Sequence, residues 1–228
     1  PSPSHLQRHV IDMAQFSGLK TWTNGTLALY ARLNLPTILQ DLDWCVYADG
    51  DTLFLADPFE LQAFQDEQIA LKGFVCPGAA QNFELAWFKQ HDVHLDVNTY
   101  LCSGFLLMNL KWFREHDAGA SCFRFMQEHP NPPFPDQDTL NAVCLGFTAG
   151  LPDGWGTYGF LCWKYPIASY KCIHYAHSLP WKKRFLWRVG YLDNAAVWVY
   201  AARAMTGYSI RELTGISPWR WALWRTYT

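Results

Sequence analysis

Three apolar runs have the length and composition of β-strands. They span residues 44–48, 69–76 and 104–110. In the first run only one phenol interrupts the apolar side chains, which is typical of a strand covered on both faces in a parallel sheet. Apolar residues at helical spacing predict helices over 26–35, interrupted by Pro36, and over 112–128. The alternation of strand and helix predicts an α/β fold.

Shorter signals place the turns between these elements. Asp57-Pro-Phe-Glu60 has a capping side chain, proline at the first helical position and an acid after it, so it predicts a helix start. Residues 77–98 show no clear period. The segment 129–136, with four prolines, carries the strongest loop signal of the chain.

Size and composition limit the class of protein. The chain has 228 residues, half of them hydrophobic, which suits one compact α/β domain, with two subdomains as the alternative. The longest purely apolar run, 195–202, is far shorter than the roughly 20 residues that cross a bilayer. Seven cysteines are an odd number without paired metal-ligand spacing, and Cys45 lies inside a predicted strand. We therefore expect a reducing, cytoplasmic location.

Charge is distributed unevenly along the chain. The net charge of −2 excludes a generally basic nucleic-acid binder, so no nucleic-acid partner is expected. Residues 182–228, however, hold eight basic against two acidic residues and five of the twelve tryptophans. Such a mixture suits a bilayer interface, and it predicts a helical, aromatic and basic C-terminal segment that attaches to the inner face of the membrane. Packing of these aromatics against the rest of the chain is the alternative.

The candidate chemistry begins at the end of the first strand. Asp49 and Asp51 follow the 44–48 run, and ligands of parallel sheets gather at the carboxyl ends of strands. Side chains at i and i+2 of an extended segment share a face. Gly50 between them removes bulk and permits unusual backbone angles. Both carboxylates can therefore reach one hard cation, Mg²⁺ or Mn²⁺, that also holds a diphosphate.

Five short segments, in this order, carry a family resemblance. They are Tyr30-Ala-Arg-Leu33, Tyr47-Ala-Asp-Gly-Asp-Thr-Leu-Phe-Leu-Ala-Asp-Pro58, Ser103-Gly-Phe-Leu-Leu-Met-Asn-Leu110, Pro135-Asp-Gln-Asp-Thr-Leu-Asn141 and Ile173-His-Tyr-Ala-His-Ser-Leu-Pro-Trp181. The set resembles glycosyltransferase family 8, the retaining sugar-nucleotide transferases of GT-A fold, over roughly residues 26–183. The resemblance implies a Rossmann-like mixed sheet flanked by helices. It also implies a GT-A domain over 1–181 whose N-terminal strand and helix would lie upstream of residue 1.

The resemblance assigns a metal site. It implies that Asp49, Asp51 and His174 are the protein ligands of a Mn²⁺ ion, with Mg²⁺ as the alternative, which bridges the phosphates of a nucleoside diphosphate sugar. Two carboxylates and one imidazole suit such an ion. The ion would stabilise the negative charge that grows on the diphosphate leaving group. Gly50 would lie at the same cofactor site.

Other residues are assigned to the donor sugar. Arg32 matches an arginine near the donor, where a guanidinium can hold phosphate or hydroxyl groups. Asp136, Gln137 and Asp138 match the loop beneath the transferred sugar, with Gln137 on the face opposite the leaving group. A residue there can act as a transient nucleophile, or the acceptor can attack from the same face; the sequence leaves both mechanisms open.

Three positions depart from the family pattern. Cys102 stands where many members have asparagine, which removes an amide from the sugar site. Lys72 stands near the position where members often carry an acid. Leu179 replaces the phosphate-binding lysine, for which Lys182, or Lys183, is the expected substitute.

The expected function is therefore metal-dependent transfer of a hexose. The donor would be a nucleotide-sugar, UDP-galactose or UDP-glucose, and the acceptor an oligosaccharide or lipid-linked saccharide in surface polysaccharide or lipopolysaccharide synthesis. One alternative is a degenerate or truncated relative that binds saccharide without catalysis. The other is a phosphatase of the haloacid dehalogenase type, although Gly50 and Thr52 are out of register for its motif and it leaves His174 without a role.

Overall fold

The computed structural model describes residues 7–21, 26–76, 83–158, 169–176 and 192–214. The chain forms two compact units. The first unit comprises 1–47 and 64–150, and the second comprises 48–63 and 151–228. The predicted boundary between residues 181 and 182 lies outside the described residues, so the two-segment division stays a prediction.

The first unit is built on a four-stranded mixed sheet of order β1-β4-β3-β5. Its strands are β1 (Trp44–Ala48), β4 (Leu101–Asn109), β3 (Leu71–Val75) and β5 (Thr148–Gly150). β3 pairs antiparallel with β4 and parallel with β5, so the sheet is mixed, as the family resemblance implies. The three predicted strands are all present.

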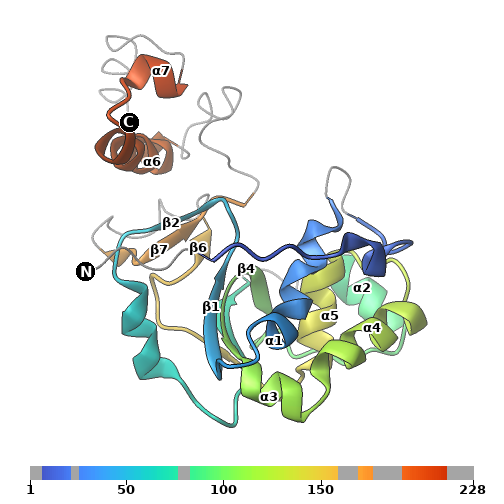
Figure 1. Cartoon of the computed structure of the whole chain (residues 1–228). Coiled ribbons are helices and arrows are strands. Elements are labelled where there is room, and N and C mark those ends of the chain that lie inside the picture. The colour runs from blue at the N-terminus through green and yellow to red at the C-terminus, as the bar shows by residue number, and fades with distance from the viewer. Residues whose placement is uncertain (1–6, 22–25, 77–82, 159–168, 177–191, 215–228) are drawn as a thin grey trace. The chain divides into compact units, whose positions relative to one another are not determined.

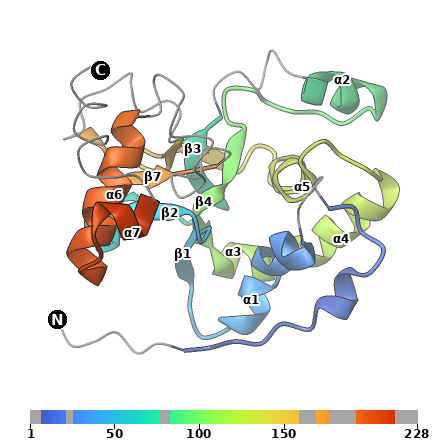
Figure 2. The same cartoon turned by 90° about the horizontal axis from the view of Figure 1, so that it is seen from above.

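Burial follows position in this sheet. All nine residues of β4 are buried, because β4 has a strand on each side and four helices lie to one side of it (Figures 1 and 2). These helices are α1 (Leu35–Ile38), α3 (Leu110–Glu115), α4 (Ala118–Glu128) and α5 (Pro135–Val143). β1, predicted to be covered on both faces, is only partly buried along its whole length. Among the described strands β1 stands at one end of the sheet order, with β4 as its hydrogen-bonded neighbour, so one of its edges is not covered by a described strand.

Short helices complete the first unit. They are the 3₁₀ helices η1 (Met13–Phe16) and η2 (Leu27–Asn34) and the α-helices α1 (Leu35–Ile38), α2 (Phe83–Gln90), α3 (Leu110–Glu115), α4 (Ala118–Glu128) and α5 (Pro135–Val143). The helical region predicted over 26–35 is a 3₁₀ helix that continues into α1. Pro36 does not interrupt it but occupies the first turn of α1, where its missing N–H costs nothing.

Two further differences have local causes. The helix predicted over 112–128 is divided, because Asp117 adopts a left-handed conformation with φ of 49° between α3 and α4. The helix α2 lies in a segment without apparent period, since five of its eight residues are apolar and leave no polar face in the sequence.

One contiguous hydrophobic core holds this unit together. It includes Phe16 and Tyr30 from the N-terminal helices, Leu106 and Met108 from β4, and Leu140 from α5. Phe16 stacks on the Tyr30 ring with a centroid separation of 5.6 Å. Burial of large apolar side chains from segments far apart in the chain is the main stabilising term for such a layer.

The second unit contains a three-stranded sheet of order β2-β7-β6. Its strands are β2 (Thr52–Phe54), β7 (Cys172–His174) and β6 (Thr157–Tyr158), with β2 antiparallel and β6 parallel to β7. The predicted helix start at Asp57 is confirmed: Asp57 Oδ1 accepts from Phe59 N at 3.0 Å, although η3 (Pro58–Phe64) is a 3₁₀ helix.

Two C-terminal helices also belong to the second unit, α6 (Leu192–Thr206) and α7 (Ile210–Thr214). Val197 and Trp198 of α6 pack against a small buried cluster of Tyr170, Ile173 and Tyr175. Among the described residues no helix combines the length and the apolarity needed to span a bilayer.

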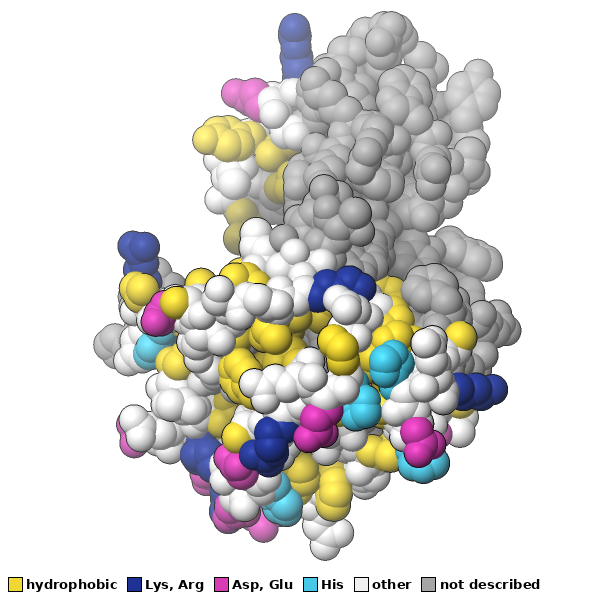
Figure 3. All heavy atoms as spheres, turned by 90° about the vertical axis from the view of Figure 1, so that its right-hand side faces the viewer, with side chains coloured by type: hydrophobic (Ala, Val, Ile, Leu, Met, Phe, Trp, Pro, Cys, Tyr) yellow, Lys and Arg dark blue, Asp and Glu magenta, His cyan; other side chains and the backbone are white. Residues whose placement is uncertain are grey.

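Figure 3 shows how charged and hydrophobic side chains are distributed over one face of the molecule. The basic side chains there are interspersed with acidic ones and with histidines, and hydrophobic side chains show between them.

Candidate metal centre and buried polar network

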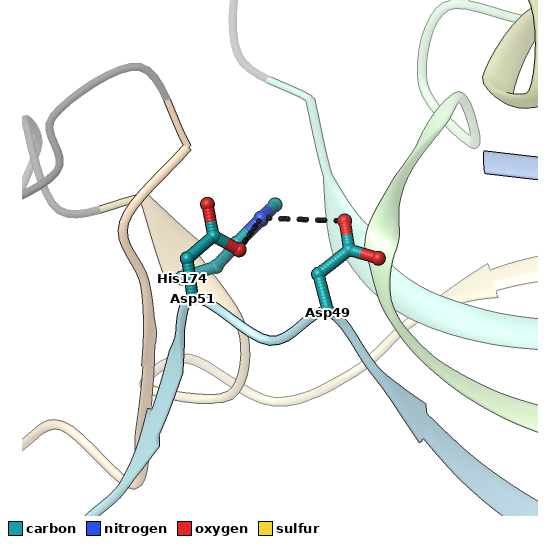
Figure 4. A group of neighbouring side chains, drawn as sticks. All are labelled: Asp49, Asp51 and His174. Carbon is teal, nitrogen blue, oxygen red and sulfur yellow. Dashed lines mark ion pairs between the residues drawn. The ribbon is translucent and has the colours of Figure 1, made fainter. Parts of the chain in front are cut away.

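Three of the predicted ligands converge in the second unit. Asp49, Asp51 and His174 each offer one ligand atom, and these atoms lie within 4.8 Å of one another. Figure 4 shows the side chains pointing toward a common point, with His174 Nε2 3.2 Å from Asp51 Oδ1 and 3.7 Å from Asp49 Oδ2. The structure thus brings together residues that are more than 120 positions apart in the chain.

Backbone hydrogen bonds explain how these side chains meet. Asp49 follows β1 directly, and Thr52 N donates to Asp49 O at 3.1 Å, which closes a turn that contains both acids. Thr52 is the register partner of His174 in the antiparallel β2–β7 pair, and Tyr175 N donates to Asp51 O at 2.9 Å. His174 is therefore fixed on the strand next to the acids.

The donor set fits a divalent cation. Two half-buried carboxylates face an imidazole whose side chain is only 6% exposed. The fit rests on the three converging ligand atoms, of which His174 Nε2 is one. His174 Nδ1, the other ring nitrogen, and Thr52 Oγ1 are buried without a hydrogen-bond partner within the described part of the chain. Mixed oxygen and imidazole ligands suit Mn²⁺, and the carboxylates alone also suit Mg²⁺.

Gly50 has no conformational reason to be glycine. It is not among the described glycines with positive φ, and a Cβ added to it would meet nothing within 4 Å. Gly50 therefore does not use the positive φ that glycine permits, and the space beside it is open.

The sugar-site candidates lie in the first unit, where they form a buried polar network. Arg32 is 4% exposed; its Nη1 lies 3.1 Å from Asp136 Oδ2 and donates to Ser103 O, and its guanidinium carbon lies 4.4 Å from the centre of the Tyr47 ring. Ser103 Oγ donates to Asp136 Oδ2 at 2.8 Å. Asp136 therefore has a charged and a neutral donor on one oxygen.

Gln137 and Asp138 continue this network. Gln137 Oε1 accepts from Ser103 N at 3.0 Å, and Gln137 Nε2 donates to the Tyr100 hydroxyl at 3.0 Å. The Tyr100 hydroxyl in turn lies 2.5 Å from Asp138 Oδ1, while Asp138 Oδ2 accepts from Phe134 N at 2.7 Å. Asp136, Gln137 and Asp138 all lie in the first turn of α5. The segment that the family resemblance describes as a loop is therefore the start of a helix.

Sequence reasoning missed Tyr100 altogether, and it gave no role to Ser103 and Asn141, although both lie in the family segments. The Asn141 side chain accepts from Leu101 N at 2.7 Å and donates to Leu101 O at 2.8 Å. Its signal was available, because it follows Gln137 by four positions and so shares a helix face with it. Tyr100 carries no comparable signal, since its partner Asp138 is 38 residues away.

The positions that depart from the family pattern are only partly described. Cys102 is buried in β4 at 1% exposure, and Lys72 forms an ion pair of 3.7 Å with Asp66. Lys182, Lys183 and Leu179 lie outside the described residues, so their expected roles stay predictions. Burial raises the pKa of the Cys45, Cys122 and Cys172 thiols to about 12, which keeps them protonated and unreactive at neutral pH.

Comparison with known proteins identifies the family. The family described as Glycosyl transferase family 8 matches residues 5–184. A Haemophilus influenzae protein named "Putative glycosyltransferase" is 29% identical over 128 residues, which cover 56% of this chain and 38% of that protein. General stress protein A of Bacillus subtilis is 25% identical over 159 residues, covering 63% of this chain and 50% of that protein. The chain thus spans half or less of these curated relatives.

Solved structures identify the fold. The galactosyltransferase LgtC, in complex with donor and acceptor sugar analogs, matches with a TM-score of 0.64 at 19% identity, over 82% of this chain and 73% of that one. The bifunctional WbbM apo structure matches with a TM-score of 0.58 at 21% identity, over 81% of this chain and 38% of that one.

These matches speak against the phosphatase alternative, because the family that covers most of the chain is one of glycosyl transferases. They also agree with the mixed sheet flanked by helices. The chain belongs to glycosyltransferase family 8 and has a GT-A fold.

Proposed function

We propose that this chain is part of a retaining glycosyltransferase that moves a hexose from a nucleotide-sugar to a saccharide acceptor. The observation that carries the proposal is the convergence of Asp49, Asp51 and His174 in a member of this family. UDP-galactose or UDP-glucose is the proposed donor, and the galactosyltransferase activity named for the structural neighbour LgtC supports that choice. The proposed acceptor is an oligosaccharide or a lipid-linked saccharide in surface polysaccharide or lipopolysaccharide synthesis.

Asp49, Asp51 and His174 would hold the metal ion, Mn²⁺ or alternatively Mg²⁺. When bound, the ion supplies Lewis-acid stabilisation to the diphosphate leaving group. Gly50 leaves open space between the two acids, which suits close approach of a phosphate. Lys182 would add a cation to the same diphosphate.

Asp136, Gln137 and Asp138 would act on the transferred sugar, with Arg32 beside them. Because Arg32 is buried and donates to Ser103 O, its role in this proposal is to hold the Asp136 carboxylate in place. Gln137 would line the face opposite the leaving group. The structural neighbour LgtC has been solved with an active-site glutamine changed to glutamate, so a glutamine belongs to the active site of that protein. This supports a role for Gln137 here.

Titration of UDP into the 228-residue chain tests the metal site. We expect heat of binding with Mn²⁺, weaker heat with Mg²⁺ and none with chelator, and loss of the Mn²⁺-dependent signal in Asp51→Asn. Asp92→Asn is the matched control, because Asp92 is exposed and has a φ of 52° that asparagine tolerates. Binding that persists unchanged in Asp51→Asn would contradict the assignment.

Turnover separates the enzyme from the alternative of a non-catalytic saccharide-binding relative. Slow hydrolysis of UDP-galactose or UDP-glucose in the absence of acceptor is expected of the enzyme, and it should require the metal. Saccharide binding without any hydrolysis, with either donor, would favour the non-catalytic alternative.

We also propose that the protein acts in the cytoplasm, attached peripherally to the inner face of the membrane. The support is the mixture of tryptophan and basic residues in 182–228, most of which lies outside the described residues. Flotation with anionic liposomes tests this. Deletion of 217–228 should abolish co-flotation, and an unchanged partition would refute the attachment.

A further inference from the structure

Tyr100 lies at the centre of a row of buried hydrogen bonds in the first unit. Its hydroxyl contacts Asp138 Oδ1 on one side and Gln137 Nε2 on the other. Beyond these, Asp138 meets Phe134 N and Gln137 meets Ser103 N. Tyr100 is 1% exposed, Asp138 0% and Gln137 8%, so solvent hardly competes for these contacts.

The direction of each bond can be assigned from its two ends. A backbone N–H only donates, so the oxygen of the Gln137 amide must face Ser103 N, and its donating nitrogen must face Tyr100. The Tyr100 oxygen accepts this bond, which leaves its own proton for Asp138. Asp138 accepts from Tyr100 through Oδ1 and from Phe134 N through Oδ2, as the two acceptor oxygens of a carboxylate allow.

The geometry points to Tyr100 as a positioning residue for Gln137. Its hydroxyl donates to Asp138 on one side and accepts from Gln137 Nε2 on the other, so it holds the nitrogen end of the amide while Ser103 N holds the oxygen end. Without the hydroxyl, the Gln137 amide keeps its contact with Ser103 N but loses the contact that holds its nitrogen end in place. The functional part of this inference rests on the proposed role of Gln137 at the transferred sugar.

The assigned hydrogen-bond directions can be tested by exchanging the amide of Gln137 and the carboxylate of Asp138, which lie on either side of Tyr100. In Gln137→Glu, the carboxylates at positions 137 and 138 compete for one hydroxyl proton. In Asp138→Asn, the oxygen of the new amide accepts from Phe134 N, and its nitrogen therefore faces the Tyr100 oxygen. The Tyr100 proton then has to find an acceptor at Gln137. Gln137 can offer its oxygen only by turning its amide nitrogen toward Ser103 N, where two donors would meet.

The double variant, Gln137→Glu with Asp138→Asn, restores every pair. The new amide at position 138 accepts from Phe134 N through its oxygen and donates to the Tyr100 oxygen through its nitrogen. Tyr100 then donates to the new carboxylate at position 137, which also accepts from Ser103 N. The row keeps all its hydrogen bonds with the direction at Tyr100 reversed.

Urea unfolding of the full chain measures this exchange. We expect both single variants to lower the unfolding midpoint and the double variant to recover most of the loss, so that it unfolds at a higher urea concentration than either single variant. Single variants that do not fold while the double variant does would give the same support. Additive losses, or a double variant that does not fold, would overturn the assigned directions.

The same exchange can be repeated in a protein that lacks the Tyr100 hydroxyl. In Tyr100→Phe the recovery should disappear, because the group that connects positions 137 and 138 is gone. Tyr30→Phe is the control: Tyr30 is equally buried, but its hydroxyl donates to Lys20 O at 2.6 Å, outside this row. In the Tyr30→Phe background, the double variant should still regain most of the urea midpoint lost by the single variants. If the double variant regains the midpoint equally in the Tyr100→Phe background, the role of Tyr100 is refuted.

Kinetics test the functional part separately. Tyr100→Phe should lower kcat for donor hydrolysis by about 10-fold or more while the Mn²⁺-dependent affinity for UDP stays within about 2-fold, since the contacts that change are those of Gln137 and Asp138 and not those of the metal ligands. An unchanged kcat would overturn the positioning role. If the unaltered protein shows no turnover, the proposed function fails, while the urea measurements still decide the hydrogen-bond directions.

Discussion

Gly154 is a residue whose backbone leaves no room for a side chain. Its φ is +96°, and a Cβ placed on it would overlap Ser169 O. The carbonyl of Gly154 accepts from Lys171 N and Cys172 N, both at 2.9 Å, and so secures the start of β7. Since β7 carries His174, this glycine supports the candidate metal centre from a distance.

Gly154→Ala should therefore destabilise the protein by more than about 2 kcal/mol, because neither the backbone angle nor Ser169 O can adjust cheaply. Chemical unfolding measures the loss. Gly50→Ala is the matched control; it meets nothing within 4 Å and should change the free energy of unfolding by less than about 1 kcal/mol. Equal losses in the two variants would contradict this account.

At the scale of elements, α5 is attached to β4 by side chains rather than by apolar contact alone. Asn141 pairs with both backbone groups of Leu101, while Gln137 and Asp136 contact the Ser103 backbone N–H and side chain. Leu101 is the first residue of β4 and Ser103 the third. These polar contacts fix the position of the first turn of α5, and thereby of the candidate sugar-site residues, along the strand.

Asn141→Ala tests this attachment. It leaves the N–H and C=O of Leu101 buried without their side-chain partner, which should cost about 2 to 4 kcal/mol in the free energy of unfolding. Asn98→Ala serves as the control, because Asn98 is exposed and its side chain bonds only to Asp96 nearby. A loss for Asn141→Ala as small as that for Asn98→Ala would show that apolar packing alone positions α5.

At the scale of the whole molecule, buried thiols link stability to alkaline pH. Burial raises the pKa of Cys45, Cys122 and Cys172 from 9.0 to about 12, and burial, followed by the charge of Cys122, raises the pKa of Cys144 well above 9.0. Below pH 9 these thiols are protonated in both the folded and unfolded states. Between pH 9 and 12 the unfolded chain releases protons that the folded chain keeps, so stability falls as pH rises.

We expect the free energy of unfolding to fall from about pH 9 upward, with each such thiol contributing about 1.4 kcal/mol per pH unit to the slope. Urea unfolding at a series of pH values measures it. Cys45→Ala removes one thiol and should make the slope shallower by one such increment. A slope that Cys45→Ala leaves unchanged would assign the alkaline loss to other groups.

Much of the candidate chemistry was already available from the sequence. The apolar runs predicted β1, β3 and β4, since continuous hydrophobicity over five to nine residues is a local property of the chain. The order of the five short segments indicated the family that the comparison confirmed. That Asp49 and Asp51 follow a strand also came from local pattern.

Only the tertiary structure decided which residues meet. His174 reaches the two acids through the register of β2 on β7, and Tyr100 reaches Asp138 through the docking of α5 on β4. Both depend on pairing between segments far apart in the chain, which leaves no periodic trace in either segment. The sequence by itself therefore determined the strands, the family and the residue types of the site, whereas long-range packing decided their geometry, the pairing of β1 with β4 and the hydrogen-bond partners of Gln137.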